Sequence, residues 1–289
     1  MCLGVLGQAQ VTVKVIANTH GGVPIPPDMA SFAVNIKDAP KLIIDDNGGP
    51  RASVIAMMGF LRNVSRSPIG ANFRIGGHEG DEAVFRWNSS SPLPHSDTYR
   101  ILPVDVTAFG YAKMFGGSIT IGLNLRYGIP SEASAFAAAC EQLLPGVVQA
   151  YEIGNEPNLY AKHGDRPSTY EYSDYAKEFQ QWAQQLQSDC NISMPRLQGG
   201  VFSNLESTPG ARWLPDVGDF IQRYAKLYLT SFSFHLYPLS PDKGTVPNLL
   251  QPDVVSIVVQ LKPYATQMRA LGKAFYVGEG STIPQGGVD

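Results

Sequence analysis

Short apolar, β-rich runs alternate with longer segments of helical periodicity from residue 29 to the end of the chain. This alternation is typical of repeated strand–helix units around a parallel sheet. The runs predict strands at 29–36, 70–76, 118–124, 147–154, 196–202, 230–236 and 273–278. The segments between them predict helices at 51–66, 105–115, 131–144, 171–189, 216–228 and 252–270.

Strict alternation of seven strands and six helices favours an α/β fold of the (β/α)8 barrel type over a doubly wound sheet. No Gly-x-Gly-x-x-Gly sequence follows the first strand, as it would in a dinucleotide-binding sheet. A closed barrel of this type has eight strands and no free edges. We therefore expect residues 29–289 to form an incomplete barrel, truncated after its seventh strand.

The first 28 residues do not follow the barrel pattern. Residues 1–10 are either the remnant of a secretory signal peptide or an ordinary N-terminus. Residues 11–16 alternate apolar and polar side chains, which predicts a strand with one solvated face. Residues 20–27 are rich in Pro and Gly and predict a linker. The expected units are therefore 1–10, 11–28 and 29–289.

Composition narrows the range of partners. The chain has 22 Lys+Arg against 25 Asp+Glu, a net charge of −3, which gives no general attraction to nucleic acid. No apolar run reaches the length of about 18 residues that suggests a membrane-spanning helix. Phosphate-binding Gly-rich motifs are absent, and the segment His78–Glu82 lacks the His pair of a zinc protease helix. No metal and no organic cofactor is predicted, and nothing in the pattern predicts an oligomeric state.

Three Asn-x-Ser triplets, at Asn63, Asn88 and Asn191, are compatible with glycosylation. Together with the N-terminal segment they favour a secreted protein. Cys140 and Cys190 form either one disulfide, as a secretory compartment permits, or two free thiols.

Two carboxylates occupy equivalent positions in the predicted barrel. Glu156 follows the fourth strand and Glu279 ends the seventh. In such barrels the carboxyl ends of the strands carry the reactive groups, and these two strands lie three apart around the ring. A pair of carboxylates facing each other across the barrel mouth is the arrangement that glycoside hydrolysis with retention requires.

The order of further motifs resembles glycoside hydrolase family 79, the β-glucuronidases and heparanases, within the large clan of retaining (β/α)8 glycosidases. The residues that carry the resemblance follow successive predicted strands from about residue 29 onward: Arg74-Ile-Gly-Gly-His-Glu-Gly-Asp81, Gly122-Leu-Asn124, Gly154-Asn-Glu-Pro-Asn158, Phe234-His-Leu-Tyr237, and Gly278-Glu-Gly-Ser-Thr282 followed by Gly286-Gly287. Asn-Glu-Pro is a motif of the clan, and the combination is what points to family 79.

The resemblance implies an exo-acting β-glucuronidase in which Glu156 is the acid/base and Glu279 the nucleophile. Asn155 would bind the sugar 2-hydroxyl. The backbone of Gly286 and Gly287 would bind the sugar carboxylate. Tyr237 would orient the nucleophile.

Three positions of the matched motifs have two readings each. His235 is either a pocket residue or a satisfied core histidine, and Tyr237 is either the orienting group or an aromatic side chain on the rim. Asp81 either binds a sugar hydroxyl or forms a turn. Asn124 belongs to the matched motif after the third strand and is expected near the substrate.

One departure bears on specificity. Many relatives carry a Tyr between the nucleophile and the two glycines, whereas this chain has Ile283 and Pro284, which removes a hydroxyl that would contact the sugar carboxylate. Two alternatives therefore stay open: another retaining specificity of the clan, such as a β-glucosidase or β-xylosidase, or an inactive fragment or sugar-binding relic. Family members also carry a β-sandwich after the barrel, and residues 11–16 would be a strand of it.

Overall fold

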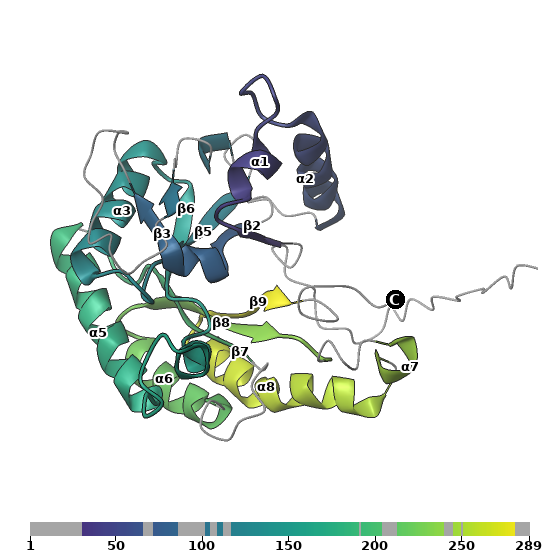
Figure 1. The fold of residues 1–289 in the computed structure, drawn as a ribbon. Coiled ribbons are helices and arrows are strands. Elements are labelled where there is room, and N and C mark those ends of the chain that lie inside the picture. The colour runs from purple at the N-terminus through teal and green to yellow at the C-terminus, as the bar shows by residue number, and fades with distance from the viewer. Residues whose placement is uncertain are drawn as a thin grey trace, which may run out of the picture.

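Seven parallel strands form one sheet, in the order β1-β2-β5-β6-β7-β8-β9 (Figure 1). This is seen in a computed structural model that describes residues 31–65, 72–85, 102–104, 109–111, 117–190, 192–203, 213–239, 245–249 and 251–280. The strands are β1 Phe32–Asn35, β2 Asn72–Gly76, β5 Ser118–Leu123, β6 Val148–Ile153, β7 Leu197–Ser203, β8 Leu229–Leu236 and β9 Ala274–Gly280. Each coincides with a predicted strand, so the predicted strand pattern is confirmed.

Helices cover the outside of the sheet (Figure 1). The long ones are α2 Ala52–Ser65, α3 Pro130–Leu143, α5 Tyr172–Asp189, α6 Val217–Tyr224 and α8 Pro252–Ala270. They match five of the six predicted helices, and most of the sixth, 105–115, lies outside the described residues. Short elements that no pattern predicted are α1 Ala39–Ile43, α4 Tyr160–His163, α7 Val246–Leu249, the 3-10 helix His78–Glu82 and the strand pair β3 Ala83–Phe85 and β4 Leu102–Val104.

Helix α5 shows why these elements form and what they cover. Its buried side chains include Tyr175, Phe179, Trp182 and Leu186, spaced so that they share one face. The aromatic ones contact aromatic rings of neighbouring elements; for example, the ring centroids of Tyr175 and of Phe202 on β7 lie 5.4 Å apart. This aromatic layer holds the wall of the barrel on which part of the site is built.

The register of the strands brings their carboxyl ends to one end of the barrel. Ser203 of β7 is level with His235 of β8, and His235 is level with Glu279 of β9. On the other side of the ring, Leu123 of β5 is level with Ile153 of β6, just before Asn155 and Glu156. Residues far apart in the chain therefore meet at one mouth.

The barrel is nearly closed, and its two edge strands are β1 and β9. A cavity of about 520 Å³ lies along this seam, bounded by residues of β1 and β9, by the end of α8, and by polar side chains of the barrel interior that include Asn72, Gln149 and Gln198. Val277 of β9 is 53% exposed, whereas β7 is buried along its length. The fold is thus a seven-stranded form of the (β/α)8 barrel, as the strand count predicted.

Several expectations can now be placed. Cys140 and Cys190 are free thiols, and Cys140 is one of the buried residues of α3. The described helices include none long and apolar enough to cross a membrane. Residues 1–10, the strand expected at 11–16, the linker at 20–27 and the glycines Gly286 and Gly287 lie outside the described residues.

Candidate active site

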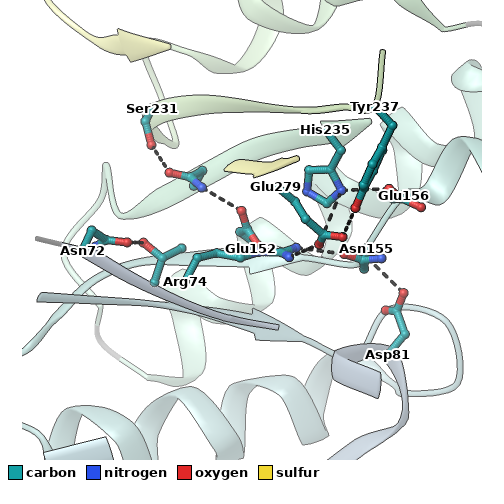
Figure 2. A network of polar contacts seen from close by, with 12 residues as sticks. Asn72, Arg74, Asp81, Glu152, Asn155, Glu156, Ser231, His235, Tyr237 and Glu279 are labelled. Carbon is teal, nitrogen blue, oxygen red and sulfur yellow. Dashed lines mark hydrogen bonds and ion pairs between the residues drawn. The ribbon is translucent and has the colours of Figure 1, made fainter. Parts of the chain in front are cut away.

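A cleft of about 1210 Å³ opens at the carboxyl ends of the strands. Its lining includes Arg74, Asn155, Glu156, Tyr237 and Glu279, which come from four different strands or the loops after them. Figure 2 shows these side chains pointing toward one another. The mouth of the barrel is therefore the place where the chemistry-bearing side chains converge, as expected for this fold.

The two predicted carboxylates meet through a buried histidine. Nδ1 of His235 lies 2.9 Å from Oε1 of Glu156 and 3.8 Å from Oε2 of Glu279. One carboxylate oxygen of each Glu and a ring nitrogen of His235 all lie within 4.8 Å of one another. His235 is fully buried. The structure thus brings Glu156 and Glu279 together, as their positions on the fourth and seventh strands predicted.

Glu279 is held as a carboxylate by three donors or cations. Nη1 of Arg74 lies 2.5 Å from its Oε2, and the hydroxyl of Tyr237 donates to its Oε1. Burial works to raise the pKa of Glu279, but His235, Arg74 and the Tyr237 hydroxyl outweigh it and lower that pKa to about 2. Glu279 is therefore negatively charged throughout the neutral and mildly acidic range.

The position of Glu279 depends on a close contact made by the residue before it, Gly278, with the neighbouring strand. A Cβ added at Gly278 would stand 2.0 Å from Oγ of Ser233 on β8. Only glycine fits there, so β9 can approach β8 closely enough to place Glu279 beside His235.

Glu156 has different surroundings. Within the described residues it makes no ion pair with Lys or Arg, and its side chain contacts His235. Its backbone is left-handed, with φ 51° and ψ 51°, and follows Gly154 at φ 82°. Its amide donates to the carbonyl oxygen of Val201 at 3.0 Å, in the bulged part of β7. A left-handed non-glycine residue costs roughly 1–2 kcal/mol, so the surrounding contacts hold Glu156 in a strained position at the cleft.

Asn155 is fixed by its oxygen. Nη2 of Arg74 donates to Oδ1 of Asn155 at 2.8 Å. This contact fixes the orientation of the amide, and its NH2 group can donate a hydrogen bond to a ligand in the cleft.

Asp81 and Asn124 lie behind the cleft. Oδ2 of Asp81 accepts from the Tyr160 hydroxyl at 2.6 Å and from the Asn155 amide at 3.0 Å, and Oδ1 accepts from two further backbone amides. Burial raises the pKa of Asp81 to about 7 although these hydrogen bonds act in the opposite direction. Oδ1 of Asn124 accepts from the amides of Tyr127 and Gly128. Both side chains bind protein groups and support the loops that carry the site.

Two charged residues of the barrel interior were given no role from the sequence: Arg74, which belongs to the motif after the second strand, and Glu152, on the fourth strand. Arg74 is 4% exposed and Glu152 is fully buried, and Nε of Arg74 donates to Oε2 of Glu152 at 2.7 Å. Burial works to lower the pKa of Arg74, but Glu152 and Glu279 outweigh it and raise it, so Arg74 stays charged. A charged residue within an otherwise apolar strand needs a buried partner of opposite charge. The presence of such a residue in each of two predicted strands could have identified Arg74 and Glu152 from the sequence.

Side chains of the types that bind metals are also present. Glu156, His235 and Glu279 form such a group in the described part of the chain. Arg74 and Tyr237 already bind Glu279, so a metal ion there would have to compete with a buried cation.

Comparison with known proteins supports the fold. No family model and no curated protein matches the chain. Among solved structures, it is similar to a 4-O-alpha-L-rhamnosyl-beta-D-glucuronidase from Fusarium oxysporum 12S in complex with Rha-GlcA, with a TM-score of 0.69 and 22% identity over 91% of this chain and 56% of that one.

It is also similar to a GH51 arabinofuranosidase from Xanthomonas axonopodis pv. citri, with a TM-score of 0.56 and 14% identity over 93% of this chain and 61% of that one. A family 51 alpha-L-arabinofuranosidase from Bifidobacterium longum gives a TM-score of 0.56 and 12% identity over 90% of this chain and 57% of that one. The chain thus spans roughly three fifths of the length of each of these structures. It shares the barrel fold of glycoside hydrolases, as the resemblance to family 79 implied.

Proposed function

We propose that the protein is a retaining β-glycoside hydrolase that removes a terminal β-linked glucuronic acid. The observation that carries this proposal is the pair of carboxylate oxygens of Glu156 and Glu279 within 4.8 Å of each other at the barrel mouth. Retaining glycosidases place their two carboxyl groups about 5 to 5.5 Å apart, whereas inverting enzymes leave about 6.5 to 9.5 Å for a water molecule.

The surroundings of the two carboxylates separate their roles. Glu279 has a permanent cation in Arg74 and a low pKa, so it is the nucleophile. Glu156 lacks such a cation in the described part of the chain and contacts His235, so it is the group that can gain and lose a proton. A nucleophile must stay ionised, whereas an acid/base must change its protonation state during each turnover.

The reaction then runs in two steps. An oxygen of Glu279 bonds to the anomeric carbon while the bond to the leaving oxygen breaks, and Glu156 gives its proton to that oxygen. The negative charge of Glu279 is lost in the ester, which makes Glu156 a better base for the second step. A water oxygen then bonds to the anomeric carbon, the ester bond breaks, and the water proton passes to Glu156.

Asn155 and Tyr237 assist the reaction. The NH2 group of Asn155 donates to the sugar 2-hydroxyl, a contact that strengthens in the oxocarbenium-like transition state. Tyr237 donates to Oε1 of Glu279 and Arg74 to Oε2, and together they fix the orientation of the carboxylate at the cleft.

Specificity for glucuronate is supported by the family resemblance and by the glucuronidase among the similar structures. Gly286 and Gly287, which lie outside the described residues, would supply backbone N–H donors to the sugar carboxylate. Such donors recognise an anion without Lys or Arg.

The test compares aryl β-glucuronide, aryl β-glucoside and aryl α-L-arabinofuranoside as substrates of the purified chain. We expect the glucuronide to be hydrolysed fastest, with the β-anomer as the first product in the NMR spectrum. Equal or inverted rates would refute the uronate specificity, and the α-anomer would refute retention.

Variants complete this test. E279Q and E156Q should each lose several orders of magnitude in turnover of a substrate with a poor leaving group, because each role is essential. E141Q, on α3 outside the barrel, serves as control. A folded chain that binds glucuronides without hydrolysing them would favour the sugar-binding alternative.

A further inference from the structure

Arg74 uses its whole guanidinium group in the barrel interior. Nε donates to Glu152 at 2.7 Å, Nη1 to Glu279 at 2.5 Å and Nη2 to Asn155 at 2.8 Å (Figure 2). Two of these partners belong to the proposed reaction. The third, Glu152, is fully buried, and it does not line the cleft.

Glu152 is itself held by donors on its other side. Its Oε1 accepts from Nε2 of Gln198 at 2.7 Å, and Oε1 of Gln198 accepts from the Ser231 hydroxyl at 2.8 Å. The chain of hydrogen bonds thus runs from β8 through β7 to β6 and on to Arg74 of β2. Both neighbours of Glu152 in this series of hydrogen bonds, Arg74 and Gln198, donate to it, which is the pattern an ionised carboxylate requires.

The charges in this interior change during the proposed reaction. Before attack, one cation, Arg74, lies between two carboxylates, Glu152 and Glu279. When Glu279 becomes an ester, its negative charge disappears. Because Arg74 is only 4% exposed, water cannot solvate its positive charge in place of that carboxylate. A buried charge without a partner is strongly destabilising. Glu152 is the anion that remains beside Arg74 at that stage.

We propose that Glu152 is a positioning residue that acts through Arg74: it is the counterion that Arg74 keeps while Glu279 is esterified, and it holds the guanidinium so that the other two nitrogens reach Glu279 and Asn155. This inference rests on the retaining mechanism proposed above. It assigns a role in the reaction to a buried side chain that does not line the cleft.

Charge and shape make different demands at this position. Glutamine has the shape of glutamate but no charge, and its NH2 group would face the Nε–H of Arg74 or the NH2 of Gln198. Aspartate keeps the charge and is shorter by one methylene. A counterion role therefore predicts that E152D retains more activity than E152Q, whereas a role in packing predicts the reverse order.

The experiment measures covalent labelling of Glu279 by a 2-deoxy-2-fluoro glycosyl donor with a good leaving group, in the wild-type chain, E152Q, E152D and E141Q. Glu141 is a matched control because it pairs with Arg196 at 2.6 Å and with the Tyr151 hydroxyl at 2.8 Å, outside the barrel. Thermal unfolding of each variant reports folding separately.

We expect the limiting rate of labelling in E152Q to fall about 100-fold, the loss expected from a small misplacement of reacting groups. The concentration of donor at half-saturation should stay close to that of the wild type, because Glu152 does not touch the cleft. E152D should lie between E152Q and the wild type, and E141Q should label at the wild-type rate even if it is less stable.

Three results would overturn the inference. E152Q labelling as fast as E141Q would do so, and so would E152Q labelling faster than E152D. If E152Q fails to fold, E152D decides: a folded E152D that loses less than about 100-fold in labelling rate supports the inference, and a larger loss counts against it. A wild-type chain that is neither labelled nor active would instead refute the proposed function, and the inference with it.

Discussion

Nη1 of Arg74 lies 2.5 Å from Oε2 of Glu279, and this pair links β2 to β9 across the inside of the barrel. The two residues are 205 positions apart in the chain. The same guanidinium also reaches Asn155. One side chain therefore sets the positions of the proposed nucleophile and of the group proposed to bind the sugar.

Replacing Arg74 with lysine tests this relationship. Lysine keeps the charge but has a single ammonium in place of a planar fork, so it cannot reach three partners in fixed directions. We expect R74K to lose about 100-fold in kcat with a smaller change in KM. Steady-state kinetics would check this, with R223K as control because Arg223 pairs with Asp219 on the surface of α6. Equal kcat values for R74K and the wild type would contradict the role of Arg74.

The hydroxyl of Tyr237 gives a prediction about pH. Burial and the nearby Glu279 raise the pKa of Tyr237, so its hydroxyl stays protonated and donates to Glu279. Removing this donor in Y237F raises the pKa of Glu279 from about 2 toward its ordinary value of 4.5. The acid limb of the kcat/KM profile should therefore move to higher pH in Y237F. The loss of a hydrogen bond to a charged group should also cost roughly 10- to 100-fold in activity.

Profiles of kcat/KM between about pH 2 and pH 8 would measure both effects. Y172F is the matched control, because the Tyr172 hydroxyl donates to Asp219 at 2.8 Å away from the cleft. An acid limb at the same pH in Y237F and in the wild type would show that Tyr237 does not stabilise the Glu279 carboxylate.

The strands could be predicted from the sequence because each buried parallel strand is a short apolar run with clear ends. The run at 118–124, for example, became β5 Ser118–Leu123. Elements of three to five residues, such as α4 Tyr160–His163 and the 3-10 helix His78–Glu82, were not predicted. They are shorter than the periods that a hydrophobic pattern needs to show itself.

The candidate site was predictable where one strand end carries one reactive group, as for Glu156 and Glu279. The contacts of Arg74 were not, because they join β2 to β6 and β9 across the interior, and only closure of the barrel brings these strands face to face. Asp81 shows the same limit. Its sequence context suggested a turn or a sugar contact, whereas its oxygens accept hydrogen bonds from two other loops.

Asp81 should make stability depend on pH. Burial raises its pKa in the folded protein to about 7, above the ordinary value of 3.8. For a group whose folded pKa is raised, the stabilisation is complete below the unfolded pKa and is lost as pH rises through the folded one. The difference in Tm between the wild type and D81N should therefore fall as pH rises from about 4 to about 7 and then level off.

Thermal unfolding at a series of pH values would check this. D189N, a change at an exposed Asp at the end of α5, controls for the loss of a charge. A difference between wild type and D81N that stays constant over this range would show that Asp81 has no raised pKa.

The contact between Gly278 and Ser233 gives a prediction about the position of the nucleophile. A Cβ at residue 278 would stand 2.0 Å from Oγ and 3.2 Å from Cβ of Ser233. G278A should therefore push β9 away from β8, costing about 1–3 kcal/mol of stability by overpacking and displacing Glu279 from Arg74. Oγ of Ser233 is buried without a hydrogen-bond partner among the described atoms, so its removal sacrifices no such bond.

A double-mutant cycle makes this prediction specific. S233G alone should leave kcat near the wild-type value, and G278A alone should lower both kcat and Tm. The double variant G278A/S233G should recover much of both losses, because the space for the new Cβ has been opened. Additive effects of the two changes would mean that the collision with Ser233 is not what requires glycine before Glu279.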